Sequence, residues 1–288
     1  MDLSDENKND VDASLRVMSF NLRYDNITAE RAAAVIAEIK NYNPDVFGVQ
    51  EDTAQWSAKS EEVFPEYTPV RYTYDSDTGS EEYETLYFRT ADFKSVESGT
   101  KWFSETPDVR SSLSGANKVR KMNYAVLTRT SDSKTFCFAN THLDNAGEDS
   151  TKWESLATVR KQQAEILIAQ LKEISQAHGN IPVIVVGDFN TTPDGLPEQY
   201  DDGVYGTVTA EVFADSRVAA SSATNRNHAT YNSAYGTTNA PSADSTILDY
   251  CFVSKDTVTV QNYCVDIGMY HNMYPSDHFP IIVDLQFQ

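Results

Sequence analysis

Short apolar runs rich in Val, Ile, Phe and Tyr recur along the chain, and Gly, Asn, Asp and Ser separate them. This alternation is typical of β-strands joined by turns. The polar stretches at 111–118 and 220–246 are predicted to be loops, because strand-like runs resume on both sides. The pattern predicts strands at 15–20, 45–50, 84–90, 123–129, 134–143, 182–189, 246–254 and 279–287.

Two segments have a helical period instead. Thr28 can cap a helix whose apolar face is formed by Val35, Ile36 and Ile39, and Pro44 lies beyond its end. Many strands and few helices favour two packed sheets with helices on their outer faces, an α/β (α+β) arrangement. A longer helix is predicted from about 151 to 174, where five apolar side chains lie near one face: Leu156, Val159, Leu167, Leu171 and Ile174.

The length of 288 residues suits one large domain. We expect this domain to span residues 15–288 and a flexible acidic leader, MDLSDENKNDVDAS, to span residues 1–14. The leader lacks the basic and apolar regions of a signal peptide. One interpretation is that it follows an export signal that is absent from this chain, but the sequence does not determine the compartment.

Charge and composition restrict the partners. The chain has 23 Lys and Arg against 43 Asp and Glu, a formal net charge of -20, and no basic stripe is visible. Proteins that bind duplex DNA usually neutralise phosphates with such a stripe, so nucleic acid is disfavoured as a partner, though not excluded. A small phosphorylated substrate held with the help of a metal ion is favoured.

The cysteines and the hydropathy exclude several classes of protein. Cys137, Cys251 and Cys264 are too few and too irregularly spaced for a zinc site or a disulfide scaffold. No apolar stretch approaches the ~18 residues of a membrane span, so no transmembrane segment is predicted. We expect a soluble monomer.

Polar residues stand at the ends of several apolar runs. Strand ends emerge from a packed core into a common rim, where such side chains converge. Taken singly, most of them can be turn residues, but a buried Glu51 or Asp249 must be paired or bound to a metal. The whole set comprises Asn21, Glu51, His142, Asp144, Asp188, Asn190, Asp249, Asp277 and His278.

Oxygen donors without thiolates suit a hard divalent ion, Mg2+ or else Mn2+ or Ca2+. Such an ion polarises a phosphoryl oxygen, a nearby carboxylate can activate water, and amide and imidazole groups can hold the phosphate. The set of residues therefore indicates metal-assisted hydrolysis of a phosphoester.

Six motifs in order carry a family resemblance: SFNLR, PDVFGVQE, NTHLD, GDFN, LDY and YPSDHFP. No single motif is specific, but together they resemble the endonuclease/exonuclease/phosphatase superfamily of deoxyribonuclease I-like enzymes, in its bacterial metal-dependent hydrolase-like branch. The resemblance spans residues 15–288. It implies a four-layer sandwich of two mainly antiparallel sheets flanked by helices.

The same resemblance implies roles for individual residues. It places Glu51 on the metal, with Asn21 in or beside the metal's shell and Asp277 beside the metal or on it. It assigns the attacking water to Asp188, which orients or deprotonates that water with help from Asn190.

The two motif histidines are implied to contact the scissile phosphate. Glu82 lies where family members often place a carboxylate that pairs with the histidine of NTHLD, here His142. Asp249 resembles the carboxylate that orients His278, and such a partner fixes the tautomer of an imidazole. Asp277 is a poor partner for His278, because adjacent residues on an extended strand point to opposite faces.

Two arginines complete the predicted site. Arg120 lies where bacterial relatives have an arginine that can clamp a substrate phosphate, and a surface arginine is the equally good alternative. Arg23 occupies a position where some nucleases have a carboxylate, and we expect it at the substrate rim. Asn145 replaces a histidine that is usual in close bacterial relatives, and the segment 146–158 is longer than usual, so the specificity stays open.

The favoured function is a divalent-metal-dependent phosphoester hydrolase, a phosphatase or phosphodiesterase acting on a small or surface-presented phosphoester. A nuclease is the alternative within the same class. A non-catalytic module that binds a phosphorylated or carbohydrate ligand on the same fold is the alternative from another class, because fold alone does not imply function.

Overall fold

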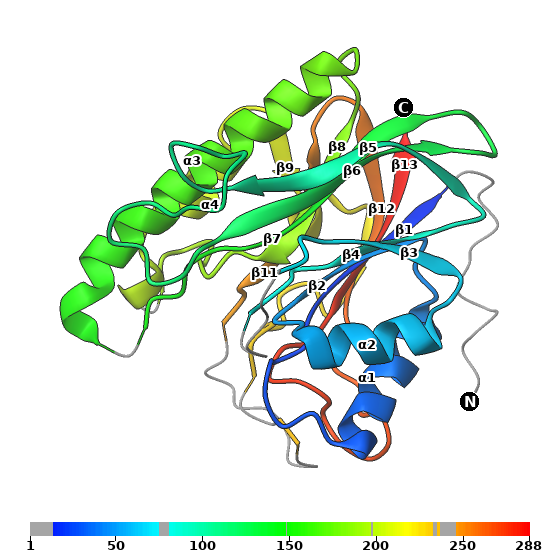
Figure 1. Cartoon of the computed structure of the whole chain (residues 1–288), viewed down its shortest axis with the longest axis horizontal. Coiled ribbons are helices and arrows are strands. Elements are labelled where there is room, and N and C mark those ends of the chain that lie inside the picture. The colour runs from blue at the N-terminus through cyan, green and yellow to red at the C-terminus, as the bar shows by residue number, and fades with distance from the viewer. Residues whose placement is uncertain (1–13, 75–80, 148, 197, 233–234, 237–245) are drawn as a thin grey trace.

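The computed structural model describes residues 14–74, 81–147, 149–196, 198–232, 235–236 and 246–288. The predicted leader at 1–14 therefore lies outside the described residues, except for Ser14. Two β-sheets pack face to face, with helices against both outer faces (Figure 1). The predicted four-layer sandwich is confirmed.

The first sheet contains the N-terminal and C-terminal strands side by side. β1 pairs with β2 in parallel and with β13 in antiparallel fashion. Most other pairs are antiparallel, so the sheet is mixed. Its order is β10 (Ser222–Thr224), β12 (Val258–Val265), β13 (Ile281–Phe287), β1 (Leu15–Asn21), β2 (Val46–Gln50), β4 (Leu86–Arg89) and β3 (Tyr67–Val70).

The second sheet is also mixed. Its neighbours pair antiparallel except for β7 and β8, which run parallel. Its order is β5 (Phe93–Trp102), β6 (Lys121–Arg129), β7 (Thr135–His142), β8 (Val183–Asp188), β11 (Asp249–Ser254) and β9 (Phe213–Asp215).

The helices cover the outer faces of the sandwich. α1 (Ala29–Tyr42) begins as predicted, because the Thr28 side chain accepts a hydrogen bond from the Arg31 N–H. α2 (Ala54–Val63) lies beside α1, and α3 (Trp153–Ala177) lies with α4 (Val204–Thr209) on the opposite side (Figure 1). The remaining helical elements are short: η1 (Ser150–Lys152), η2 (Glu198–Tyr200) and α5 (Ser216–Ala219).

Three apolar cores lie between the four layers. Along β8, Ile184 and Val186 pack between the sheets, whereas Val183 and Val185 pack towards α3. This alternation follows from the two-residue period of a strand, and it explains why the inner strands read as continuous apolar runs. The third core joins α1 and α2 to the outer face of the first sheet.

Asn140 links the two sheets with polar contacts inside the apolar core. Its side-chain amide donates to the Val49 and Thr85 carbonyls, at 2.7 and 3.1 Å, and accepts a hydrogen bond from Gln50 at 2.7 Å. A methyl group at Gly48 would lie 2.5 Å from the Asn140 side chain, so only glycine allows this approach. The link fixes the sheets against each other near the ends of β2 and β7.

Strand register brings the predicted site residues to one end of the sandwich. His142, the last residue of β7, and Asp249, the first residue of β11, both pair with Asp188 at the end of β8. In the other sheet, Asn21 at the end of β1 pairs with Gln50, which precedes Glu51. The convergence expected from the strand ends is therefore present.

Candidate active site

Asp188 lies at the centre of the cluster. Its Oδ2 atom is 3.1 Å from Asn21 Nδ2, 3.5 Å from His142 Nε2 and 3.7 Å from His278 Nε2. Its Oδ1 atom accepts the Asn190 N–H at 2.9 Å. The residue is only 2% exposed, so one buried carboxylate faces both histidines and an amide.

His278 is oriented by Asp249. The ring Nδ1 lies 2.8 Å from Asp249 Oδ2, so the predicted hydrogen bond is confirmed and the ring presents Nε2 towards Asp188. Burial lowers the pKa of His278, but Asp249 and Asp188 outweigh burial and raise it to about 10. The imidazole is therefore held in its protonated form, with one N–H available on the side of the site.

His142 is oriented by a second carboxylate. Its Nδ1 atom is 3.3 Å from Glu82 Oε2, the pairing that the resemblance implied, and Asn190 Nδ2 is 3.1 Å from its Nε2. Burial and Arg120 lower the pKa of His142, but Asp188 and Glu82 outweigh them, and the pKa is raised. Each imidazole thus has a carboxylate of its own.

Arg120 forms an ion pair with Glu82. The guanidinium is 2% exposed, and its Nη1 atom lies 2.8 Å from Glu82 Oε2 and 3.8 Å from Glu84 Oε1. Burial raises the pKa of Glu82, but Arg120 and His142 hold it well below its ordinary value. Arg120 and His142 thus contact the same Glu82 oxygen, and the clamp role of Arg120 towards a substrate phosphate stays a prediction.

Sequence reasoning missed a buried ion pair next to this arginine. Lys121 and Glu84 are each 1% exposed and bond to each other, and Lys121 also donates to the Glu82 carbonyl at 2.7 Å. A lysine inside a strand is the only sequence signal, and it does not name the partner. Glu82, Glu84 and His142 lie close enough to hold a metal, but Arg120 and Lys121 already supply positive charge there.

Glu51 is the carboxylate best suited to a metal. Its Oε1 atom accepts from Asn21 Nδ2 at 3.2 Å, and its Oε2 atom accepts the Tyr24 N–H at 3.1 Å. Burial raises the pKa of Glu51, and no lysine or arginine of the described residues forms an ion pair with it. A bound cation would supply the missing positive charge.

Asp277 and Arg23 lie side by side. Arg23 Nη1 is 2.6 Å from Asp277 Oδ2, and the same guanidinium pairs with Asp25 at 2.7 Å. Its face also lies 4.4 Å from the centre of the Tyr235 ring. The predicted metal-side carboxylate and the predicted substrate-side arginine therefore form one ion pair, and their roles stay predictions.

The donor set fits a hard divalent ion. Glu51, Asn21 and Asp277 offer only oxygen ligands, and Asp188 and Asp249 with His278 form a second group of close donor atoms. Glu51, a buried carboxylate without a lysine or arginine partner among the described residues, favours positive charge at this end of the sandwich. These residues thus match the chemistry of Mg2+, Mn2+ or Ca2+ better than that of a softer metal.

The fold and this set of residues define an enzyme of the phosphoester hydrolase class. The chain belongs to the endonuclease/exonuclease/phosphatase family, whose model matches residues 18–278. The predicted resemblance is therefore confirmed. No curated protein matches the sequence.

Solved structures share the fold over nearly the whole chain. A mannosyl-6-phosphatase of Bacteroides thetaiotaomicron is 26% identical, covering 95% of this chain and 100% of its own, with a TM-score of 0.80. A family protein from Bacteroides vulgatus is 26% identical over 96% of this chain and 99% of its own, with a TM-score of 0.77. The human Nocturnin catalytic domain with bound sulfate, 21% identical over 96% of this chain and 94% of its own, has a TM-score of 0.68 and shows the fold alone.

Among the described residues, the helices are too short or too polar to cross a lipid bilayer.

Proposed function

We propose that the protein is a divalent-metal-dependent phosphoester hydrolase that cleaves a small or surface-presented phosphoester by attack of water. One observation carries the proposal. The carboxylate of Asp188 lies within 3.7 Å of both His142 and His278, and each imidazole contacts a carboxylate of its own. A carboxylate base and two imidazoles thus lie together, an arrangement that suits phosphoryl transfer.

In this mechanism Asp188 accepts the proton of the attacking water, the P–O bond to the leaving group breaks, and the departing oxygen takes a proton from solvent. Asn21 and the Asn190 N–H hold the carboxylate in place, at 3.1 and 2.9 Å. His278, kept protonated by Asp249, donates its Nε2 proton in a hydrogen bond to a phosphoryl oxygen, where negative charge builds up. His142 Nε2 lies 3.5 Å from the same Asp188 oxygen and 3.1 Å from the Asn190 amide nitrogen, so it borders the place where the phosphate would bind.

Glu51 would hold the metal, with Asn21 and Asp277 beside it. When bound, a divalent ion neutralises charge on the phosphoryl oxygens and lowers the pKa of bound water. Arg23 keeps Asp277 oriented through their ion pair at 2.6 Å. Asn21 contacts both Glu51 and Asp188, so the metal side and the water side of the site share one amide.

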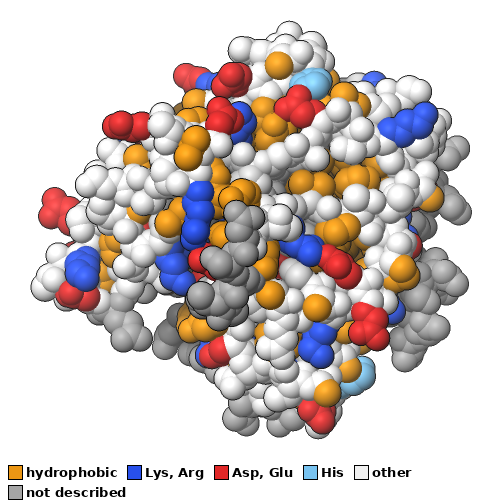
Figure 2. Space-filling view, in the orientation of Figure 1, with side chains coloured by type: hydrophobic (Ala, Val, Ile, Leu, Met, Phe, Trp, Pro, Cys, Tyr) orange, Lys and Arg blue, Asp and Glu red, His pale blue; other side chains and the backbone are white. Residues whose placement is uncertain are grey.

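A small substrate is favoured over a nucleic acid. The net charge is -20. On the face of the molecule drawn in Figure 2, basic side chains form separate groups among acidic and apolar ones. A strand of DNA would meet an unfavourable field over most of the surface. The mannosyl-6-phosphatase among the similar structures supports phosphorylated sugars as the first substrates to test.

The test is a hydrolysis assay with purified protein and Mg2+, Mn2+ or Ca2+. The panel contains mannose 6-phosphate, glycerol 3-phosphate, bis-p-nitrophenyl phosphate and supercoiled plasmid. Wild type is expected to release phosphate from a monoester or to cleave the small diester, and EDTA should abolish this. Asp188→Asn should lower kcat by about 10²- to 10⁴-fold, the usual contribution of a general base.

Asp256→Asn is the matched control, because Asp256 is exposed in the turn between β11 and β12. It removes the same charge far from the site and should leave kcat unchanged. Plasmid nicking lost in Asp188→Asn would instead identify a nuclease. Calorimetric binding of metal without hydrolysis of any substrate in the panel would contradict the proposal and support a binding module.

A further inference from the structure

Tyr231 is an exposed residue held rigidly at the site. Its neighbours Thr230 and Asn232 are 0% and 1% exposed, whereas Tyr231 is 40% exposed. The Thr230 hydroxyl accepts the backbone N–H groups of Leu248 and Asp249, at 2.9 and 3.0 Å. The Asn232 N–H donates to the Asp277 carbonyl at 2.6 Å. The backbone on both sides of Tyr231 is thus fixed to the segments that carry Asp249 and His278.

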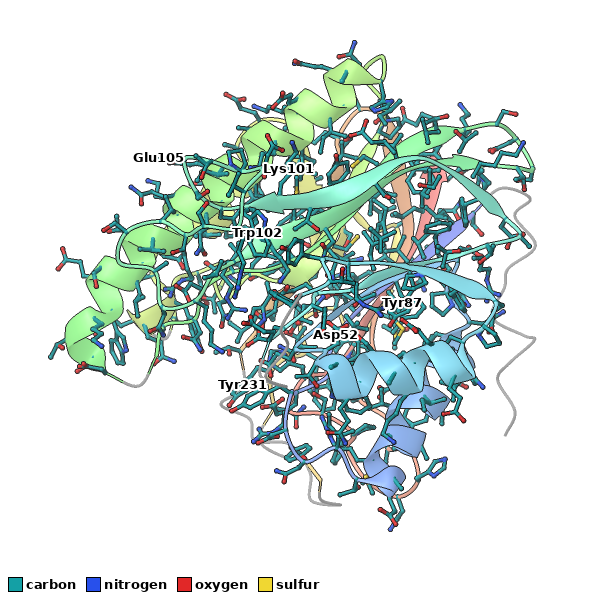
Figure 3. The ribbon with its side chains drawn as sticks, in the orientation of Figure 1. Asp52, Tyr87, Lys101, Trp102, Glu105 and Tyr231 are labelled. Atoms are coloured by element: carbon teal, nitrogen blue, oxygen red, sulfur yellow. The ribbon has the colours of Figure 1, made fainter. Side chains whose placement is uncertain are left out.

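The ring of Tyr231 contacts the ring of His278. Their centroids are 5.2 Å apart at an interplanar angle of 68°, and the two backbones form a β-bridge. A residue whose only task was to support His278 would be expected to be buried. Tyr231 is instead partly exposed near the edge of the molecule in the view of Figure 3, and its hydroxyl makes no hydrogen bond to any described residue.

The charged groups of the site affect the pKa of Tyr231. Burial raises its pKa first, and Asp277, Glu51 and Asp188 raise it further. Arg23 is the cation that opposes this shift, and its guanidinium is already paired with two carboxylates. Arg23 is therefore not available to pair with a second anion beside Tyr231.

A second tyrosine, Tyr200, comes from another segment and is half-buried. Burial raises the pKa of Tyr200, and Asp188 and Tyr231 contribute to the rise. Tyr200 lies in η2, which is held by a buried arginine. Arg160 donates to the Gln199 carbonyl at 2.8 Å and pairs with Asp202 at 2.6 Å. Both tyrosines are thus presented by fixed backbone.

We propose that Tyr231 forms the wall of a leaving-group subsite that binds the ring of a phosphorylated sugar. An aromatic face packs against the apolar C–H face of a sugar ring, and a free phenol hydroxyl can bond to a sugar hydroxyl. A neutral leaving group is favoured, because the Arg23 guanidinium is already paired with two carboxylates and would not neutralise a second phosphate. This inference rests on the proposed phosphoester hydrolase function.

The test compares wild type, Tyr231→Ala and Tyr231→Phe on three monoesters with the same metal. Mannose 6-phosphate has a sugar ring, glycerol 3-phosphate has none, and adenosine 5′-monophosphate offers a base. Tyr231→Ala should raise KM for mannose 6-phosphate about tenfold, the loss of about 1.4 kcal/mol of contact, with little change in kcat. Tyr231→Phe keeps the ring and should recover most of the loss. Kinetics on glycerol 3-phosphate should change less than about twofold.

Several outcomes would overturn the subsite. An equal loss on mannose 6-phosphate and glycerol 3-phosphate would mean that Tyr231 merely supports His278. No change on any substrate, or a loss confined to adenosine 5′-monophosphate, would also refute a sugar subsite. If wild type hydrolyses none of the monoesters, the proposed phosphatase activity fails separately. Saturation-transfer NMR with mannose 6-phosphate then decides, since its ring protons should show transfer in wild type and not in Tyr231→Ala.

Discussion

Asp249→Asn isolates the charge that orients His278. The substitution keeps the shape of the side chain but removes the negative charge 2.8 Å from the ring Nδ1. Burial lowers the pKa of His278, and Asp249 and Asp188 together raise it to about 10. Without Asp249, burial is opposed mainly by Asp188, and the pKa should fall to its ordinary value or below.

The size of the effect follows from the protonated fraction. At pH 8 an imidazole with a pKa of about 10 is about 99% protonated, whereas one with a pKa of about 6.5 is about 3% protonated. If the imidazolium donates to the phosphoryl oxygen, kcat of the variant at pH 8 should be at least about 30-fold below wild type. Lower pH restores the proton on His278 in the variant. The difference in kcat between wild type and the variant should therefore narrow towards pH 6.

The assay is kcat between pH 6 and 9, together with an NMR titration of the His278 ring in metal-free protein. Asp215→Asn is the matched control. Asp215 is another buried carboxylate of the same sheet, but it bonds to Arg217 and Tyr205 rather than to His278. Asp215→Asn should lower the free energy of unfolding without changing the pKa of His278. A His278 pKa that stays above about 9 in Asp249→Asn, or a deficit that is equal at all pH values, would refute the reasoning.

Three further predictions concern the metal, a buried acid and a glycine. Glu51→Gln should weaken binding of Mg2+ at least about tenfold by calorimetry and should remove the rise in Tm that Mg2+ gives wild type. Burial and Asp266 raise the pKa of Glu38 well above its ordinary value, and one of its oxygens has no partner. As pH rises above about 4.3, the Glu38 carboxyl loses its proton in the unfolded chain but keeps it in the folded protein. Rising pH therefore favours the unfolded chain and lowers the free energy of unfolding. Glu38→Gln should raise Tm at pH 8 by about 2 °C or more, and the gain should vanish near pH 4; an equal gain at both pH values would contradict this cause. Gly187 has a φ of 155°, and a methyl group there would clash with a carbonyl of the neighbouring strand, so Gly187→Ala should cost more than about 1 kcal/mol in urea unfolding. Gly206→Ala, in α4 with open space around it, should be neutral or stabilising, and equal losses in the two variants would refute the steric argument.

The strands buried on both faces could be predicted from the sequence, and the partly exposed ones could not. β5 was missed because only its two end residues are buried and a bulge between Ser95 and Glu97 interrupts its pairing. β12 was missed because a bulge between Val260 and Asn262 shifts its alternation. The short β9 and β10 have too few residues to form a pattern, and β3 contains Pro69.

α2 was missed for a different reason. Its buried face combines one large apolar side chain, Trp56, with the small polar residues Ser57 and Ser60. A helix with so little apolar periodicity has no clear signal in the sequence. Packing of Trp56 in the core with α1 holds it instead.

The pairing of His278 with Asp249 could be predicted, because strand geometry excludes the adjacent carboxylate as a simple partner and the motif order supplies another. The surroundings of Arg120 could not. Its position in a loop-like stretch suggested exposure, whereas the fold buries it between Glu82 and Asp144. A linear pattern shows that a charge is present, but the partner that makes its burial tolerable comes from a distant segment.

The backbone of the site has conformations that no hydrophobic pattern reveals. Arg23, Glu51 and Asn190 have φ values of 56°, 58° and 48°, in the left-handed region that costs a non-glycine residue about 1 kcal/mol or more. Each follows the end of a strand and turns the chain out of the sheet. Polar contacts hold these turns, since Glu51 accepts the Tyr24 N–H and the Asn190 N–H donates to Asp188. The same side chains that are proposed to hold the metal and the water therefore also stabilise the strained turns that present them, which ties the local geometry of the site to its chemistry.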